Sequence, residues 1–196
     1  MFKEIIKPAL ILFIVCAVIT GALAYVNGVT EPIIDENNKK AEQESLAKAI
    51  PGAESFSDPK SAEQLKAEGY SVSDRIVKVY EAQKGGASFG YVVEVSTKGY
   101  GGAIKMFVGV DKAQSVTGVL LASHNETPGL GSKASDPSFS DQYLGAIPEK
   151  EFFVVKSSPK ADHEIQAISG ATVTSRAVTQ GVSDAIALIR SMAGGV

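Results

Sequence analysis

An uncharged, apolar stretch from Pro8 to Thr30 constrains this chain more than any other feature of its sequence. A helix of about 20 apolar residues is long enough to cross the hydrocarbon core of a bilayer. The stretch therefore predicts one membrane-spanning helix. Residues 1–30 are expected to form a short cytoplasmic tail and a transmembrane anchor.

Charges on either side of the apolar run favour one orientation of this helix. Lys3 and Lys7 precede the run, whereas the first charge after it is Glu31. Because cytoplasmic flanks carry an excess of lysine and arginine, we expect a single-pass protein of the cytoplasmic (inner) membrane with its N-terminus in the cytoplasm. A cleaved signal peptide is the alternative, since Ala22-Leu23-Ala24 fits a cleavage site, but the length of the run favours an anchor. Either interpretation places residues 31–196 on the extracytoplasmic side.

Composition excludes several kinds of chemistry. The formal net charge is −3 and there is no basic cluster, which argues against nucleic-acid binding. The single cysteine, Cys16, lies inside the apolar run, so the rest of the chain has no disulfide and no Cys-ligated iron–sulfur cluster. His124 and His163 are the only histidines and form no paired motif, so we expect no metal site. Any redox role must therefore depend on an organic cofactor.

The rest of the pattern predicts a helical stalk at residues 31–52 and an extracytoplasmic domain at residues 53–196. The stalk is mostly polar, its few apolar residues recur at helical spacing, and Pro51-Gly52 ends the predicted helix. Turns too short for crossover helices separate the strands of the domain, so its sheet should be largely antiparallel. Segments rich in Val, Ile, Tyr and Phe predict strands over Arg75–Ala82, Ser88–Ser96, Ala103–Val110 and Ser115–Ala122.

Helices and one further strand complete the expected domain. Short helices are expected at Ser61–Glu68 and near Asp136–Leu144, and a strand at Phe152–Lys156. Val178 and Val182 begin a series of apolar residues at helical spacing, which predicts an amphipathic helix at the end of the chain. The fold class is therefore α+β: a largely antiparallel sheet with packed helices, preceded by one transmembrane helix and a helical stalk.

The run directly before the last helix, Ser169-Gly170-Ala171-Thr172-Val173-Thr174-Ser175, contains four hydroxyl side chains. It predicts a loop that enters a helix N-terminus, where free N–H groups and the helix dipole attract phosphate. Helix capping is the alternative, and spacing alone favours it because Ser and Thr are common N-caps. A cap needs one hydroxyl, so the surplus favours a phosphate ligand.

Two other clusters follow strands. Lys98-Gly99-Tyr100-Gly101-Gly102 is typical of a tight turn with an exposed aromatic ring, and a plain hairpin loop is its default interpretation. The segment from Ser123 to Gly131 has the sequence SHNETPGLG, which places two ionisable groups, an amide and a hydroxyl beside a Pro-Gly turn. A solvated loop explains it equally well on sequence alone.

Taken together, these motifs resemble those of the FMN-binding domain family, over about residues 75–190. The family includes the G subunit of the Rnf/Rsx electron-transport complex and the C subunit of the sodium-pumping NADH:quinone reductase. In it, FMN is joined by a phosphoester to the last Thr or Ser of S/T-G-A-T-x-T, which is Thr174 here. The resemblance implies that a separate flavin transferase makes this bond with FAD as donor. In its modest length, the chain resembles the G subunit of the Rnf complex more closely than the C subunit of the sodium-pumping reductase.

The resemblance also implies which residues surround the flavin. Tyr100 is expected to stack near the ring, and His124 and Glu126 to orient their loop or tune the ring. Among the hydroxyls other than Thr174, each is expected to bind phosphate or cap the helix. No catalytic residue is expected. The full set expected to bind the cofactor is Tyr100, Glu126, Thr127, Gly129, Leu130, Ser169, Gly170, Ala171, Thr172, Thr174 and Ser175.

The function implied is a membrane-anchored electron carrier with covalent FMN. It would relay electrons to and from other membrane subunits of an Rnf-type complex, which couples ferredoxin and NAD redox chemistry to ion translocation. One helix without intramembrane charge offers no ion path, so this chain alone is not expected to pump ions. No independent catalytic activity is expected either. Two alternatives remain open. One is an anchored extracytoplasmic module that binds a phosphorylated ligand without a redox role, and the other is a stand-alone flavinylated domain that serves an extracellular reductase.

Overall fold

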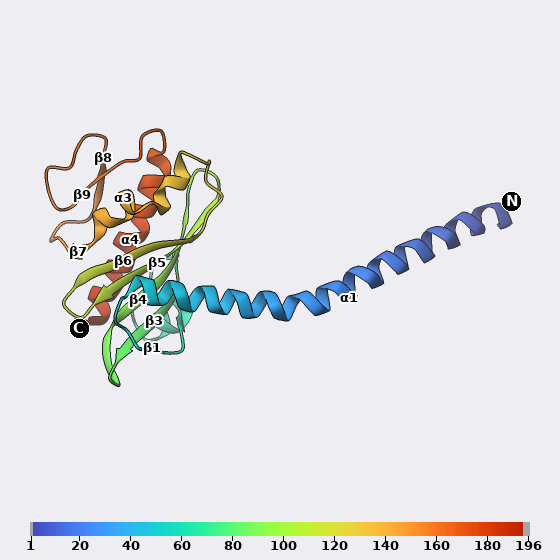
Figure 1. The fold of residues 1–196 in the computed structure, drawn as a ribbon, viewed down its shortest axis with the longest axis horizontal. Helices are drawn as coiled ribbons and strands as arrows, with labels where there is room; N and C mark the ends of the chain where they lie inside the picture. The colour runs from blue at the N-terminus through green and yellow to red at the C-terminus, as the bar shows by residue number, and fades with distance from the viewer. Residues whose placement is uncertain (1, 194–196) are drawn as a thin grey trace. The chain divides into compact units, whose positions relative to one another are not determined.

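The computed structural model describes residues 2–193, which fall into two units divided between Gln43 and Glu44. Helix α1 (Phe2–Ala49) supplies the first unit and its last turns belong to the second. Figure 1 shows the order of the elements, from α1 in blue to the closing helix α4 (Thr172–Ala193) in red.

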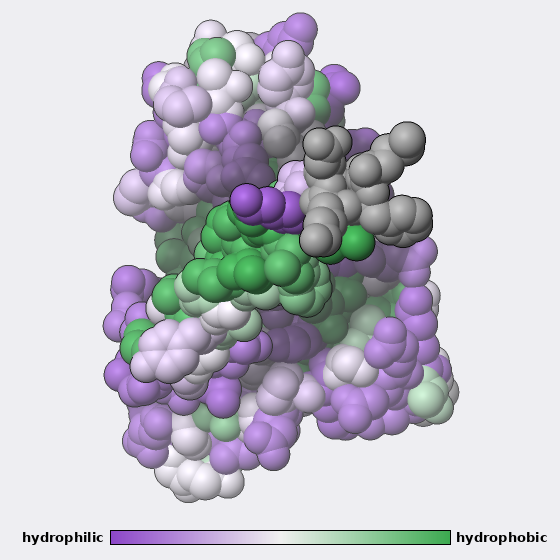
Figure 2. Space-filling view, turned by 90° about the vertical axis from the view of Figure 1, so that its right-hand side faces the viewer, coloured by the Kyte–Doolittle hydropathy of each residue, from purple (hydrophilic) through white to green (hydrophobic). Residues whose placement is uncertain are grey.

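The first unit is helical, and its uncharged residues 8–30 are of the kind that membranes accept. Among the described residues there is one candidate span, Ile6–Ala49, a helix that is long enough and, over one window, apolar enough to cross a bilayer. Its large side chains face outward, and Leu12, Phe13 and Val18 expose 65%, 70% and 66% of their surface. The space-filling view shows such apolar side chains gathered in green along the helix (Figure 2). A helix that is apolar on all sides suits lipid rather than water, as the predicted anchor requires.

The second unit is built on a seven-stranded sheet in the order β1-β3-β4-β5-β6-β7, with β2 also paired to β3. Every pairing in it is antiparallel. Alternating apolar and polar residues with tight turns between them fix this meander, so the predicted sheet is confirmed. Its four long strands are β3 (Ile76–Lys84), β4 (Ala87–Lys98), β5 (Ala103–Asp111) and β6 (Ser115–Ser123).

Short elements at the edges of the sheet were less predictable. The expected helix near Ser61 is present as α2 (Ala62–Ala67), where the Ser61 hydroxyl accepts the Gln64 N–H in a capping box. Three edge strands were not expected, because two residues leave no periodicity to detect. They are β1 (Ser55–Phe56), β2 (Lys60–Ser61) and β7 (Gly145–Ala146).

The segment between β6 and α4 is more divided than the sequence predicted. The single helix expected near Asp136–Leu144 is present as two consecutive short helices, and a further short helix that was not expected precedes them. The strand expected at Phe152–Lys156 is present but pairs in parallel outside the main sheet, with an unexpected partner. In chain order these elements are η1 (Gly131–Ser135), α3 (Pro137–Ser140), η2 (Asp141–Tyr143), β8 (Phe153–Val155) and β9 (Glu164–Gln166).

Helix α4 covers one face of the sheet, where it packs against β4 and β5 (Figure 1). The predicted apolar stripe is confirmed, because Val178 and Val182 are fully buried against Val95 and Met106. A Cβ at Gly181 would lie 2.9 Å from Met106 Cε, so the glycine lets helix and sheet approach closely. This packing fixes the position of the first turn of α4.

The last turn of α1, within the second unit, packs on the other face of the sheet. Glycines on three neighbouring strands make room for it, since a Cβ at Gly90 would meet Ile50 and one at Gly109 or Gly118 would meet Ala49. The Thr117 hydroxyl donates a hydrogen bond of 2.6 Å to the carbonyl of Ala49. The end of the helix therefore rests directly on the backbone of the sheet.

Candidate functional site

The hydroxyl-rich run forms a turn followed by the first turns of α4, as predicted. Gly170 adopts a φ of 79°, which a glycine accepts without strain, and the Ala171 N–H donates to the Ile168 carbonyl. A Cβ at Gly170 would lie 3.0 Å from the side chain of Leu130, so the glycine also admits that side chain. The first N–H groups of α4 therefore lie beside the loop that contains Leu130.

Ser175 is the hydroxyl that fixes this turn. Its Oγ accepts the Ile168 N–H at 3.0 Å and donates to the Ala171 carbonyl at 3.0 Å. The side chain is fully buried. Ser175 therefore uses its hydrogen-bonding capacity within the protein, where it ties the first turns of α4 to the preceding turn and does not cap the helix.

A chain of hydrogen bonds supports the same turns of α4 from behind. The Thr179 hydroxyl donates to the Ser175 carbonyl at 2.8 Å and lies 2.7 Å from the Tyr143 hydroxyl. Tyr143 is packed edge-on against Phe139 and Phe152. Burial raises the pKa of Tyr143 well above its usual range, although the hydrogen bond with Thr179 opposes this shift. The phenol is therefore a neutral, structural partner of the helix.

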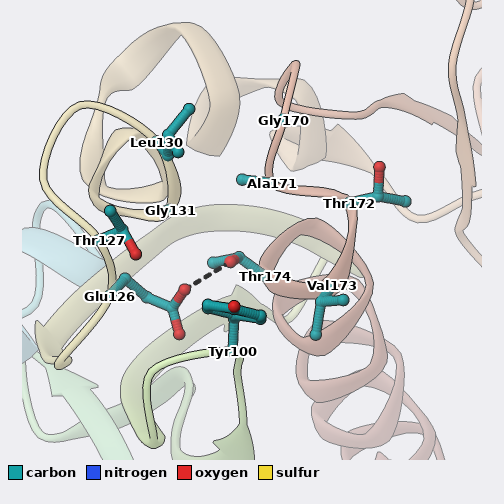
Figure 3. A pocket seen from close by; sticks show the side chains of 10 residues that line it. All are labelled: Tyr100, Glu126, Thr127, Leu130, Gly131, Gly170, Ala171, Thr172, Val173 and Thr174. Carbon is teal, nitrogen blue, oxygen red and sulfur yellow. Dashed lines mark hydrogen bonds between the residues drawn. The ribbon is translucent and has the colours of Figure 1, made fainter.

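Thr174 meets a buried carboxylate. Its Oγ1 donates a hydrogen bond of 2.6 Å to Glu126 Oε2. The other carboxylate oxygen, Oε1, accepts the Gly101 N–H at 3.0 Å. Thr174 is 1% exposed and Glu126 is 6% exposed. In Figure 3 the two side chains point toward each other, Glu126 from its loop and Thr174 from the helix.

Glycines form the walls around this carboxylate. A Cβ at Gly99 or Gly131 would meet an oxygen of Glu126, and one at Gly101 would meet the Asn125 carbonyl. Any other residue at these positions would displace the carboxylate or its loop. We call the space bounded by Gly99, Gly101 and Gly131 the glycine niche.

His124 helps to hold the loop that carries Glu126. Its Nδ1 accepts the Glu126 N–H at 3.3 Å, and its Nε2 lies 3.2 Å from the Ser135 hydroxyl. A nitrogen that accepts an N–H carries no proton, so the neutral ring has its proton on Nε2 and donates it to Ser135. The predicted loop-orienting interaction of His124 thus has a geometric basis.

Glu126 and Thr174 line a pocket of about 580 Å³. That volume lies within the range typical of ligand pockets, about 300–1,000 Å³. Its exposed rim is apolar, with Tyr100 on one segment and Leu130 and Val173 on two others (Figure 3). Among the described residues that line the pocket, none is a lysine, arginine or histidine. The pocket therefore has an apolar mouth, a hydroxyl and a carboxylate inside, and no cationic side chain.

Eight of the eleven residues expected to bind a cofactor line this pocket, and three do not. Ser175 is buried in the turn, the Gly129 N–H donates to Ser132, and Ser169 borders a separate groove of about 300 Å³. The sequence did not single out Gly131 or Val173. Gly131 ends the TPGLG segment, and Val173 lies between Thr172 and Thr174, so their motifs were signals that pointed to them. The eight are Tyr100, Glu126, Thr127, Leu130, Gly170, Ala171, Thr172 and Thr174.

Two family models match the chain. The FMN-binding domain matches residues 99–187, which contain the whole pocket, and the RnfG N-terminal region matches residues 1–48. The motifs around Tyr100, Glu126 and Thr174 thus lie within a known flavin-binding domain. The chain is an FMN-binding-domain protein whose N-terminal helix matches the RnfG N-terminal region.

Two relatives indicate which kind of FMN-binding-domain protein this chain is similar to. The G subunit of the Na⁺-translocating ferredoxin:NAD⁺ oxidoreductase complex of Acetobacterium woodii is 36% identical over 196 residues, which cover 97% of this chain and 94% of that protein. The G subunit of the proton-translocating ferredoxin:NAD⁺ oxidoreductase complex of Clostridium ljungdahlii is 42% identical over 116 residues, which cover 59% of this chain and 62% of that protein. The chain therefore belongs to the family of G subunits of Rnf-type ion-translocating oxidoreductases.

A solved structure also resembles this fold. The crystal structure of NqrC from Shewanella oneidensis aligns with a TM-score of 0.49 and 23% identity, and covers 60% of this chain and 59% of that chain.

Proposed function

We propose that this protein is a membrane-anchored electron carrier that holds FMN as a phosphoester on Thr174. It relays electrons between other subunits of an Rnf-type complex. Membership of the family of Rnf-type G subunits and the FMN-binding domain support the electron-carrier role and the cofactor. The single observation that carries the covalent attachment is the Thr174 hydroxyl, which lies inside the pocket and donates to a carboxylate.

The residues of the pocket suit FMN. Gly170 and Gly131 occupy positions where a Cβ would fill space next to Leu130 and Thr174. The apolar rim at Tyr100 and Leu130 offers surfaces for an aromatic ring system, and the first turn of α4 offers N–H groups for a phosphate. FMN supplies the redox chemistry, since it accepts two electrons and releases them singly. The chain orients the cofactor and tunes it.

The charge of the pocket argues against a module that binds a free phosphorylated ligand. A phosphate monoester carries nearly two negative charges at neutral pH. Here it would face the buried carboxylate of Glu126 without any cationic side chain among the described residues of the lining. A phosphodiester carries one charge, and its covalent bond needs no cation to retain it. The third alternative, a stand-alone flavinylated domain, is disfavoured by similarity along the whole chain to subunits of complexes.

For topology, we propose the arrangement that the flanking charges favour. Residues 1–30 form the cytoplasmic tail and anchor, residues 31–52 the stalk, and residues 53–196 the extracytoplasmic flavin domain. A tethered flavin cannot diffuse away outside the cytoplasm, which is a physical motive for the ester. Maturation then requires a flavin transferase with FAD as donor, and the working partners are the other membrane subunits.

Flavin fluorescence after denaturation tests the attachment. The full chain is co-expressed with a flavin transferase, separated on a denaturing gel and viewed under ultraviolet light. The wild-type band should fluoresce and Thr174→Ala should be dark. Ser158→Ala is the matched control, because Ser158 is an exposed hydroxyl outside the pocket, and its band should stay bright. A bright Thr174→Ala band refutes the assignment, and a dark wild-type band favours the binding-module alternative.

A second experiment tests the partners. The tagged chain is purified from native membranes in mild detergent, and co-purifying proteins are identified by mass spectrometry. Recovery of multi-helix membrane subunits supports the Rnf-type complex. Recovery of the chain alone supports the stand-alone alternative.

A further inference from the structure

The arrangement around Glu126 is more specific than a ligand wall requires. Burying a carboxylate is unfavourable unless hydrogen bonds or a positive charge compensate for the lost water. Here one oxygen accepts the Gly101 N–H and the other accepts only the Thr174 hydroxyl, and the described residues give Glu126 no salt bridge. Gly99 and Gly131 leave the space for this carboxylate, and Gly101 leaves space for the backbone of its loop. The glycine niche therefore places one carboxylate within hydrogen-bond distance of one hydroxyl.

We propose that Glu126 is the general base for the esterification of Thr174, so that the chain itself activates its own acceptor. This inference rests on the proposed function, the phosphoester at Thr174. A threonine hydroxyl is a weak nucleophile and needs a base within hydrogen-bond reach, about 2.6–3.2 Å. Glu126 Oε2 lies 2.6 Å from Thr174 Oγ1, and this hydrogen bond already points the hydroxyl proton at the carboxylate.

The step balances with a flavin dinucleotide as donor. Thr174 Oγ1 attacks the phosphorus that carries the riboflavin part, and a new Oγ1–P bond forms. The bond between this phosphorus and the bridging oxygen breaks, and adenosine monophosphate leaves with the electron pair. The hydroxyl proton moves to Glu126 Oε2. Nothing is oxidised or reduced, and the total charge is unchanged because the carboxylate becomes neutral as the adenylate gains a charge.

The neutral form of Glu126 also suits the product. An ionised carboxylate beside a phosphodiester would place two negative charges together in a buried niche, which is unfavourable. A protonated Glu126 instead donates a hydrogen bond where it previously accepted one. The Gly101 N–H still has a carbonyl-type oxygen, Oε1, to bind. One proton transfer therefore activates the hydroxyl and removes the repulsion.

The same geometry explains the choice among the four hydroxyls of the run. Ser175 donates to the Ala171 carbonyl, which is no base. Ser169 borders a different groove, and the structure records no hydrogen bond between Thr172 and a carboxylate among the described residues. Thr174 alone among them donates to a carboxylate within the described part of the chain. Selectivity for Thr174 therefore follows from this chain and does not depend on the transferase alone.

The experiment follows flavin incorporation into the unmodified protein. The full chain, purified in detergent without co-expressed transferase, is mixed with transferase and FAD, and covalent flavin is measured over time. Glu126→Gln keeps the shape of the side chain and removes the base, so the rate at saturating FAD should fall by about 10²–10⁴-fold. The FAD concentration at half-maximal rate should stay the same. Glu149→Gln, an exposed glutamate outside the pocket, is the matched control and should react at the wild-type rate.

The outcomes separate the two proposals. If Glu126→Gln reacts as fast as wild type while Thr174→Ala stays dark, the base assignment is overturned and the phosphoester stands. If the wild-type protein incorporates no flavin, both are overturned. Glu126→Asp covers the case in which Glu126→Gln does not fold. It retains a carboxylate withdrawn by one methylene, and a rate between those of wild type and Thr174→Ala supports the base, whereas an unchanged rate contradicts it.

Discussion

Gly131 lies against the carboxylate of Glu126, so an alanine at this position tests how tightly the glycine niche is packed. Its Cβ would meet Glu126 Oε2 and would lie 2.8 Å from Glu126 Cβ and 2.9 Å from Thr174 Oγ1. Ordinary van der Waals contact of a Cβ begins at 3.4 Å, so its neighbours must move. Gly131 does not have a positive φ, and alanine therefore adds no backbone strain.

The expected cost follows from which neighbour moves. Overpacking a filled site costs about 1–3 kcal/mol. Moving the carboxylate away from Thr174 loses a hydrogen bond to a charged group, worth about 1.5–3 kcal/mol. Alanine in place of glycine also raises the free energy of unfolding by about 0.4–1 kcal/mol, because it restricts the conformations of the unfolded chain. We expect Gly131→Ala to lower the free energy of unfolding by about 2–5 kcal/mol, the sum of the first two terms minus the third.

Urea unfolding of the full chain in detergent, followed by near-ultraviolet circular dichroism, measures this cost. Gly129→Ala is the comparison, because Gly129 has a φ of 76° and nothing within 4 Å of its Cβ position. Its cost, about 1–2 kcal/mol, is pure backbone strain. Each change is then combined with Glu126→Ala in a double-mutant cycle.

The double-mutant cycle tests whether contact with the Glu126 carboxylate causes the loss of stability in Gly131→Ala. Gly131→Ala with Glu126→Ala should cost at least about 1 kcal/mol less than the sum of the single changes, because the clashing oxygens are gone. The Gly129→Ala pair should add to within about 0.5 kcal/mol. If the Gly131→Ala pair is additive, or if Gly131→Ala costs under about 0.5 kcal/mol like a surface change, the reasoning about the niche is refuted.

Two further predictions concern the support of the helices. Thr117→Val removes the hydrogen bond to the Ala49 carbonyl and should cost about 0.5–1.5 kcal/mol in urea unfolding. Gly118→Val would overlap Ala49 and should cost about 1–3 kcal/mol in the same assay. A Gly118→Val cost under about 0.5 kcal/mol, like that of a surface change, would contradict the glycine contact. Burial raises the pKa of Tyr143 in the folded state above its unfolded value of 10.0. The contribution of the neutral Tyr143 phenol to the free energy of unfolding is therefore complete below pH 10. It is lost as the pH rises toward the folded pKa, at up to about 1.4 kcal/mol per pH unit. Tyr143→Phe should lose less stability than wild type between pH 10 and 11 in alkaline unfolding curves, and an identical slope would contradict the buried, neutral phenol.

Local physics explains why the long elements were predictable. Alternation along β4 places Val93 and Val95 in the core, and the turns that flank it contain glycine, so pattern and structure agree. The two-residue strands carry no such pattern. Ser55 and Phe56 form a strand only because they lie opposite Gln83 and Ala82. The parallel pairing of β8 with β9 likewise depends on tertiary contacts rather than on local sequence.

The site was predictable as three motifs but not as one arrangement. Glu126 and Thr174 are 48 residues apart in the chain, and their hydrogen bond exists only because α4 and the loop meet. One sequence signal did favour burial of Thr174, since it lies four residues before Val178 on the apolar face of the helix. Nothing in the sequence indicated that Ser175 would be used to fix the preceding turn.

Hydroxyl chemistry and charge together explain why one residue of the run is suited to carry a cofactor. A phosphate at the start of α4 meets favourable N–H groups, but also a buried carboxylate and no cationic side chain in the described lining. For a free phosphate, the N–H groups are favourable and the carboxylate is unfavourable. For an ester the two no longer oppose each other, because ester formation takes the proton from Thr174 and gives it to Glu126. The niche that disfavours a dissociable anion is thus the niche that favours making the covalent bond. On this argument, the glycines around Glu126 matter as much to flavin attachment as the hydroxyl that accepts it.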